Sequence, residues 1–545
     1  MRAFAFAAAL LASLPSFAIA APPPPAPKLV VAVSVDQYSS ELFRRYRASY
    51  TDGLATLSRG IAYPVGYQSH AATETCPGHS TILSGRHPAG TGIVANNWFD
   101  RRTGSTVYCV AVPGDPVARG PANMRATTLG DWMKAADPRD RVYAVSGKDR
   151  AAITMAGHRA DGVWWWEDGR GFVTSPAAGP ATPAVTGPAR AFDAATFAHW
   201  RQGKPMLWPQ PSPACAGLAA PHRFGQLDVT GEVPPAAALR SEEPTDFMAT
   251  DSFRDALRAS PLFDTLAADF AIATIARQRL GRGAGTDLLA VSLSATDYIG
   301  HRFGNGGAEM CVQQAALDAT LGRLMDAIRA TGVPALVVLT ADHGATDAAE
   351  REQEHDPEAA RLDSAALVAA LNKAMREETG LGYDPIVGDD PQQLTVNVGT
   401  DAALAARVRS AAVAWLKRQP QVRVVLTADE VAAATVPPGT PPDRLTIAQR
   451  FHESFDPARS GDIAVAYAAR TSFGLPRSPG DVVAGHGSPW DHDRQVPILF
   501  WWPGVTPEDR PAPAETVDIA PTLAKAVGVA TPAVDGRVLE LGAND

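Results

Sequence analysis

Short, strongly apolar runs that alternate with helix-like stretches constrain the fold of this chain more than any other feature. The clearest runs are Leu29–Val35, Arg141–Val145, Leu288–Leu293, Ala335–Leu339 and Val496–Phe500. Buried runs of this length, separated by helical segments, are typical of a parallel sheet covered by helices. We therefore predict an α/β fold with a central, mostly parallel sheet flanked by helices. Pro497 in the last run suits an edge strand or the start of a strand.

Two long segments between these runs differ from them in composition and in hydrophobic pattern. Residues 155–245 are rich in Pro, Ala and Trp, which predicts a loop-rich insertion over the core. Residues 355–480 mix helical and strand patterns, including a candidate strand at Leu394–Val398, and predict a second insertion that could form a lid. The catalytic core is then expected in three parts, at 29–154, 246–354 and 481–545.

The first twenty residues have the pattern of an export signal. Arg2 precedes the apolar run Ala3–Leu14, and Ala18-Ile19-Ala20 is a small-residue cleavage site. A proline-rich leader follows at 21–28. The alternative is a membrane anchor, but the apolar stretch is short for a bilayer span. We expect a soluble protein in the periplasm or secreted from the cell, where disulfides persist. Two bridges are then possible, in three connectivities, among Cys76, Cys109, Cys215 and Cys311.

The overall charge argues against one class of partner. A formal net charge of −9 and a pI near 5.8 provide no basic field for gathering nucleic acid. We expect no nucleic acid as a stable partner, no membrane association and a monomer. An anionic substrate would have to be attracted locally, by metal ions or a few basic side chains.

Three of the apolar runs are followed closely by an aspartate, at Asp36, Asp297 and Asp342. Ligands of open α/β sheets bind beyond the carboxyl ends of the strands, so three carboxylates at that edge predict a cation site. Taken singly, an aspartate after a strand is usually a turn or helix cap. The joint pattern favours the cation site.

Histidines accompany these aspartates. His301 follows Asp297 by one helical turn, and His343 follows Asp342 directly. His486 lies between two glycines, where a backbone can approach closely. A mixed set of carboxylate oxygens and imidazole nitrogens suits zinc better than magnesium or calcium.

These residues carry a family likeness. The matching pieces, in order along the chain, are Asp36, Thr75-Cys76-Pro77-Gly78-His79, Asn96, Asp297-Tyr298-Ile299-Gly300-His301, Asp342-His343-Gly344 and Gly485-His486-Gly487. With them the chain resembles the threonine-nucleophile branch of the alkaline phosphatase superfamily. That branch includes the PafA-type bacterial alkaline phosphatases and the nucleotide pyrophosphatase/phosphodiesterases. The sulfatase branch is set aside, because Thr75 and His79 stand where it requires a modified Cys or Ser and an Arg.

The resemblance implies a two-zinc centre and a division of labour. One zinc would be held by Asp297, His301 and His486. The other would be held by Asp36, Asp342 and His343, with the Thr75 oxygen completing its shell. Thr75 would be the nucleophile of a phosphate-ester hydrolase and would pass through a phospho-threonine intermediate.

Lys148 and Arg150 bear on which ester is cleaved. The segment Lys148-Asp149-Arg150 follows a predicted strand and resembles the Lys-x-Arg pair of the PafA-type monoesterases. A monoester dianion carries one terminal charge more than a diester, which these two cations, with a hydrogen bond from Asn96, would meet. The expected substrates are therefore small phosphate monoesters. Two alternatives stay open: a phosphodiesterase that stacks a base on Trp164–Trp166, and an exported metal- or phosphate-binding protein without turnover.

Overall fold

The structure is a computed structural model, and it describes residues 24–203, 205–235, 248, 250–388 and 390–542. The predicted export signal at residues 1–20 lies outside the described residues. So does the first part of the proline-rich leader.

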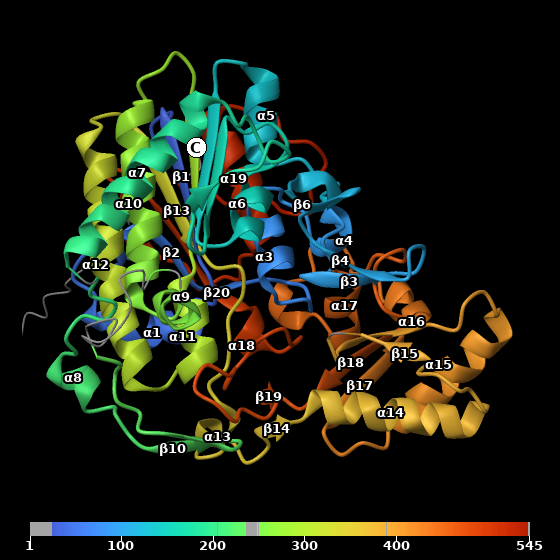
Figure 1. The fold of residues 1–545 in the computed structure, drawn as a ribbon. Helices are drawn as coiled ribbons and strands as arrows, with labels where there is room; N and C mark the ends of the chain where they lie inside the picture. Colours follow the sequence, from blue (N-terminus) through green and yellow to red (C-terminus); the bar gives the residue numbers. More distant parts are fainter. Residues whose placement is uncertain (1–23, 204, 236–247, 249, 389, 543–545) are drawn as a thin grey trace, which may run out of the picture.

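A nine-stranded sheet forms the centre of the molecule (Figure 1). Its strands, in spatial order, are β21 (Glu508–Asp509), β2 (Ile61–Tyr67), β20 (Gln495–Trp501), β13 (Ala335–Thr340), β1 (Leu29–Val35), β12 (Asp287–Leu293), β7 (Arg141–Ser146), β8 (Gly162–Glu167) and β9 (Gly171–Val173). Neighbours run parallel from β13 through β1, β12 and β7 to β8, and again between β2 and β21. The predicted α/β class with a mostly parallel sheet is confirmed.

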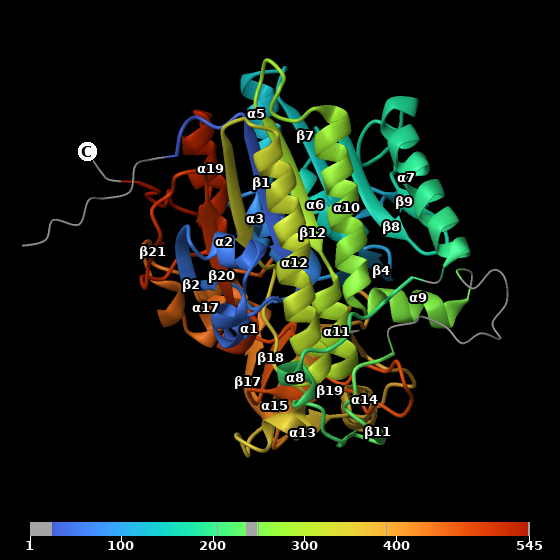
Figure 2. The same cartoon turned by 90° about the vertical axis from the view of Figure 1, so that its left-hand side faces the viewer.

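The side chains of β1 show how this sheet separates two cores. Leu29, Val31 and Val33 belong to one buried cluster, and Val30 and Ala32 to the other, because successive side chains of a strand point to opposite faces. Helices α10 (Pro261–Gln278) and α12 (Ala308–Ala330) cover the first face; α3 (Thr75–Ile82), α5 (Leu129–Ala136), α6 (Asp149–Ala156) and α19 (Ile519–Val527) cover the second (Figure 2). Burial on both faces explains why the strands are apolar throughout rather than alternating.

Strand β20 runs antiparallel between β2 and β13, so of the two positions that Pro497 suggested, an edge strand or the start of a strand, the edge is wrong. Pro497 is its third residue, near the start. The pairing with β13 begins only at Leu499, and a register shift in β2 between Tyr63 and Gly66 lies opposite the proline. The missing N–H of Pro497 is therefore accommodated inside the sheet by a local irregularity.

Residues 155–245 contain more regular structure than the loop-rich insertion we expected. The triple tryptophan lies in β8, an integral strand of the sheet, and the 20-residue helix α7 (Pro183–Gln202) follows β9. Trp164 is 1% exposed and packs against Phe270 of α10. The Trp-rich composition did not reveal this strand in the sequence. Three consecutive tryptophans are compatible with a strand because β8 is buried on both faces. Between α7 and residue 235, the described residues form the short elements α8 (Pro213–Ala216), β10 (His222–Phe224) and β11 (Leu227–Val229), which are joined by loops.

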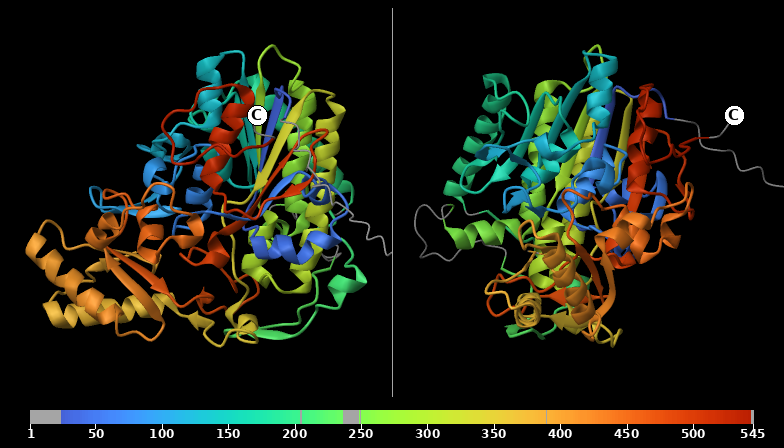
Figure 3. Two further views of the ribbon diagram at one scale, coloured as in Figure 1. Left: turned by 180° about the vertical axis from the view of Figure 1, so that it is seen from behind. Right: turned by 90° about the vertical axis from the view of Figure 1, so that its right-hand side faces the viewer.

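Residues 355–480 build a smaller layer of their own beside the main sheet (Figure 3). Its antiparallel sheet has the order β15 (Ile386–Val387), β16 (Gln393–Val396), β18 (Ile463–Tyr467) and β17 (Val422–Thr427). Helices α14 (Ser364–Thr379) and α15 (Ala402–Leu416) pack on it around a separate hydrophobic cluster. The mixed helix and strand pattern seen in the sequence is thus one packed α/β layer. Where the domain boundaries lie stays a prediction.

Two disulfides join distant segments. Cys76 bonds to Cys109, and Cys215 bonds to Cys311, which selects one of the three possible connectivities. Within the described residues, no single helix is both long and apolar enough to cross a bilayer. The helix α9 (Asp251–Arg258) meets those criteria only together with α10, as a pair bent by 76°.

Candidate metal and phosphate site

The carboxyl ends of four neighbouring parallel strands, β13, β1, β12 and β7, meet at one edge of the sheet. The predicted residues follow these strands directly: Asp342 and His343 after β13, Asp36 after β1, Asp297 and His301 on α11 (Ala295–Phe303) after β12, and Lys148 and Arg150 at the start of α6 after β7. His486 arrives from the loop between β19 (Thr471–Phe473) and α18 (Asp491–Arg494). The sheet topology therefore brings the candidate ligands together at the carboxyl ends of the strands, where open α/β sheets bind their ligands.

Asp297, His301 and His486 form the first group of ligand atoms. The Nε2 atoms of His301 and His486 lie 3.2 and 3.4 Å from the same oxygen, Oδ1 of Asp297. The Nδ1 atoms donate to backbone carbonyls, from His301 to Ala484 at 2.9 Å and from His486 to Thr73 at 2.7 Å. These bonds set the tautomer in which Nε2 is a bare lone pair, as a metal ligand requires.

Asp36, Asp342 and His343, the ligands predicted for the second ion, also lie close together. His343 Nε2 lies 3.3 Å from Asp342 Oδ2 and 3.5 Å from Asp36 Oδ1, and all three side chains are fully buried. His343 Nδ1 donates to the carbonyl of Gly344, so here too Nε2 faces the carboxylates. Burial lowers the pKa of His343 to about 3, which keeps the ring neutral and able to bind a metal ion.

His79 is a member of this neighbourhood that the sequence reasoning did not assign. Its Nδ1 lies 3.0 Å from Asp342 Oδ2 and 2.9 Å from the carbonyl of Thr75, and its Nε2 lies 2.9 Å from Ser292 Oγ. Both ring nitrogens are thus already engaged. We infer that His79 orients Asp342, whereas His343 offers the free nitrogen. The sequence feature that could have indicated this role is the position of His79, one helical turn after Thr75 and therefore on the same face of the helix.

The charges at this edge do not balance within the protein. Three buried carboxylates, Asp36, Asp297 and Asp342, outnumber the two cationic side chains described beside them. Lys148 Nζ lies 2.7 Å from Asp36 Oδ2 and 2.5 Å from Asp297 Oδ2, and Arg150 also interacts with the charge of Asp36. Burial and the charges of Asp297 and Asp342 raise the pKa of Asp36 well above its usual value. Buried carboxylates in excess are tolerated when they are paired or coordinate a metal.

Unpartnered atoms point to the same conclusion. Oδ1 of Asp297, Oδ2 of Asp342 and Nε2 of His343 are buried and make no well-aligned hydrogen bond with the described residues; the groups closest to them are other members of the cluster, at 3.0–3.5 Å. Such atoms are rare in folded proteins and call for an explanation. Each belongs to one of three groups whose ligand atoms lie within 4.8 Å of one another: Asp297, His301 and His486; Asp36, His79 and Asp342; and Asp36, Asp297 and His343. The donor set fits divalent metal ions.

Thr75 is the first residue of α3 and is 1% exposed. Arg150 Nη2 lies 3.3 Å from its Oγ1. The free N–H groups at the start of a helix favour negative charge, so an anion at Thr75 would meet both α3 and the guanidinium. The structure places Thr75 and Arg150 in contact across 75 residues of sequence.

The remaining candidate residue, Asn96, directly precedes a small hairpin formed by β3 (Asn97–Asp100) and β4 (Ser105–Tyr108). The side-chain oxygen of Asn96 accepts from the backbone N–H of Cys76 at 2.8 Å, which leaves the Asn96 amide nitrogen free to donate. Tyr108 pairs with Asn97 at the same, open end of the hairpin, donates to Asp149 at 2.6 Å and contacts Arg150. The disulfide between Cys76 and Cys109 ties this hairpin to the helix of Thr75.

Comparisons with known proteins agree with this arrangement. The sequence model of the type I phosphodiesterase / nucleotide pyrophosphatase family matches residues 30–489. Alkaline phosphatase PhoK from Sphingomonas sp is 42% identical to this chain, in an alignment that covers 96% of this chain and 92% of PhoK. Alkaline phosphatase PhoD from Zymomonas mobilis is 39% identical, and the alignment covers 94% of this chain and 88% of PhoD. The crystal structure of wild-type alkaline phosphatase PafA superimposes with a TM-score of 0.79 at 25% identity, over 94% of this chain and 98% of that one.

Proposed function

The chain belongs to the type I phosphodiesterase / nucleotide pyrophosphatase family, and on this premise we propose that it is a phosphate monoester hydrolase of the alkaline phosphatase kind. The observation that carries the proposal is the contact between Thr75 and Arg150 beside a buried cluster of carboxylates and imidazoles. The two relatives that share 42% and 39% identity with it are alkaline phosphatases by name. A binding protein without turnover would need the ligands but no nucleophile.

We propose two zinc ions as cofactors, because oxygen and nitrogen donors are mixed. Asp297, His301 and His486 would hold one ion, and Asp36, Asp342 and His343, with Thr75, the other. The bound ions would supply Lewis acidity that lowers the pKa of a hydroxyl and offsets the charge of the leaving oxygen.

The residues of the chain have separate tasks in the two displacements we propose. Thr75 Oγ attacks phosphorus, the Oγ–P bond forms, and the bond to the leaving alkoxide breaks. A water molecule then attacks the phospho-threonine, the Oγ–P bond breaks, and inorganic phosphate leaves. Asn96, Lys148 and Arg150 hold the non-bridging oxygens through both steps, where preorganised donors stabilise developing charge best.

Lys148 and Arg150 also favour a monoester over a diester. A diester replaces one charged oxygen with a second organic group, so it would offer these two cations one charged oxygen fewer. The rival proposal of a base stacked on the tryptophans loses support, since Trp164 is enclosed in the core and Trp166 is 8% exposed among aromatic rings.

We further propose that the protein is exported and acts as a monomer in the periplasm or outside the cell on small phosphate esters. All four cysteines form disulfides, which suits an oxidising compartment. The negative net charge gives no reason to expect a nucleic-acid partner.

The test compares an aryl phosphate with a bis-aryl phosphate on protein of known metal content. Wild type should prefer the monoester. The double variant Lys148→Ala with Arg150→Ala should lower kcat/KM for the monoester by about 100-fold or more, because it removes two charged hydrogen bonds that contribute about 1.5–3 kcal/mol each. The decrease in kcat/KM of this variant for the diester should be much smaller. Equal losses on both esters would contradict the assignment, and failure to trap phosphate on Thr75 would contradict the nucleophile.

A further inference from the structure

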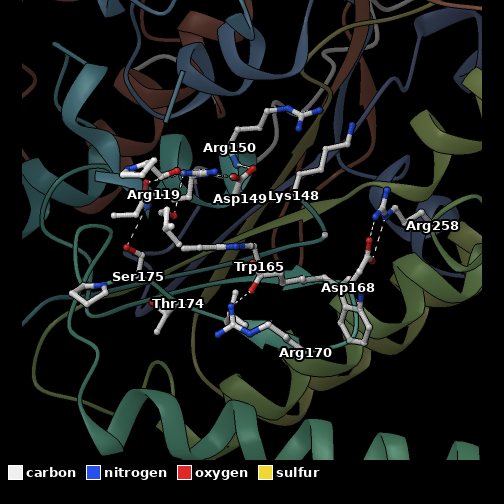
Figure 4. A pocket seen from close by; sticks show the side chains of 18 of the residues that line it. Arg119, Lys148, Asp149, Arg150, Trp165, Asp168, Arg170, Thr174, Ser175 and Arg258 are labelled. Atoms are coloured by element: carbon white, nitrogen blue, oxygen red, sulfur yellow. Dashed lines mark hydrogen bonds and ion pairs between the residues drawn. The ribbon is translucent and has the colours of Figure 1, made fainter. Parts of the chain in front are cut away.

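A cleft of about 670 Å³ lies next to the candidate site along the same edge of the sheet (Figure 4). It is bounded by the turn Gly147–Arg150 after β7, the end of β8 and the strand β6 (Asp115–Arg119). Ligand pockets for small organic molecules have volumes of roughly 300–1,000 Å³. The cleft is therefore too large for phosphate alone and fits the organic part of an ester.

The cleft and the phosphoryl position share a wall. Lys148 and Arg150 line the cleft, and their charged ends reach Asp297 and Thr75. Tyr298, which directly follows Asp297, lines the cleft as well, and its ring centroid lies 4.9 Å from Lys148 Nζ. A phosphoryl group held at Thr75 would thus have its leaving group within reach of this cleft.

The arginines of the outer wall are already paired. Arg119 lies 3.4 Å from Asp149, Arg258 forms an ion pair with Asp168, and Arg170 forms one with Glu167. Asp115 adds a fourth carboxylate. Apart from Lys148 and Arg150, which are assigned to the phosphoryl group, the described lining of the cleft therefore holds three cations and four anions. A second phosphate group would have to break an ion pair and would meet no excess of positive charge. The wall therefore disfavours leaving groups that are themselves anionic.

The same wall suits a neutral group with many hydroxyls. Guanidinium groups donate and carboxylates accept, and each sugar hydroxyl can do both. Trp165 also lines the cleft and offers an apolar edge to the carbon face of a sugar. We propose that this cleft binds the leaving group of sugar monophosphates, which makes them preferred over sugar bisphosphates. This inference rests on the proposed monoesterase function.

The test uses ester pairs whose leaving groups are alike in basicity. Glucose 6-phosphate and ethyl phosphate both release a primary alkoxide, and the ratio of their kcat/KM values isolates binding of the sugar. The double variant Glu167→Ala with Arg170→Ala removes one exposed ion pair of the wall together with its hydrogen-bonding groups, and Val117→Trp, at a position 79% exposed, narrows the cleft. The matched control is Arg223→Ala with Asp228→Ala, an exposed ion pair on β10 and β11 that does not line the cleft.

We expect both cleft changes to lower the ratio about fivefold or more, as the loss of one or two hydrogen bonds would, with ethyl phosphate hydrolysis unchanged. The control should leave the ratio as it is. Wild type should also hydrolyse fructose 6-phosphate faster than fructose 1,6-bisphosphate. An unchanged ratio in both variants, or faster turnover of the bisphosphate, would overturn the inference while the proposed function stands. A wild type inactive on both test esters would overturn the two together.

Discussion

Asp264 is predicted to hold the helix that carries Asp297 and His301. It lies on α10, is 1% exposed, and accepts from the backbone N–H of Ala295, the first residue of α11, at 2.7 Å. Its other oxygen accepts from Gln313 Nε2 at 2.8 Å. The residue before α11, Ser294, makes no side-chain cap, so the cap is supplied from another helix.

The change Asp264→Ala should weaken both the fold and the metal site. Two buried donors lose their acceptor, at about 1–3 kcal/mol each, so the free energy of unfolding should fall by about 3 kcal/mol. Because the start of α11 would then have to be ordered when the metal ion binds, metal affinity should fall about tenfold, which corresponds to 1.4 kcal/mol. Asp264→Asn keeps an oxygen for Ala295 and should restore most of both quantities.

The assays are urea unfolding of the metal-free protein and competition for zinc with a chromogenic chelator. Asp318→Ala is the matched control. Asp318 is also buried and accepts from backbone N–H groups of residues 51, 52 and 54, at 2.7, 2.9 and 2.7 Å, but it caps α2 (Gly53–Leu57), which carries none of the proposed ligands. The Asp318→Ala change should lower the free energy of unfolding without changing the affinity for zinc. Equal loss of affinity in both alanine variants, or none in Asp264→Ala, would refute the reasoning.

Two further predictions concern the phosphate-holding residues and the dependence of stability on pH. Tyr108→Phe removes the hydroxyl that contacts Arg150, so kcat/KM for a monoester should fall about tenfold with a smaller effect on a diester; equal effects would contradict the positioning role. Burial raises the pKa of Asp193 to about 7, so the folded state binds a proton that the unfolded state releases near pH 4. Stability should therefore fall as the pH rises from about 4 to 7, and Asp193→Asn should flatten this slope in urea-unfolding midpoints measured at pH 5 and 8; a slope that the variant leaves unchanged would exclude Asp193 as its source.

The sequence alone was sufficient for the class of fold and for the edge that bears the site. Strands buried on both faces must be apolar along their whole length, and such runs are visible without coordinates. Parallel strands also deliver the residues after them to one edge, so Asp36, Asp297 and Asp342 could be grouped from their positions after strands. The spacing of Asp297 and His301 by one helical turn was readable for the same local reason.

Only the tertiary structure decided which distant groups meet. The tautomer of His486 depends on a carbonyl at Thr73, more than 400 residues away, and no local pattern encodes that bond. The roles inferred for His79 and Asp264 depend on how α3 and α10 pack beside the strands. The pairing of the cysteines depends on α3 lying beside the β3–β4 hairpin and on α8 lying beside α12. Long-range contacts arise from packing of whole elements, whereas sequence patterns report the periodicity of one element at a time.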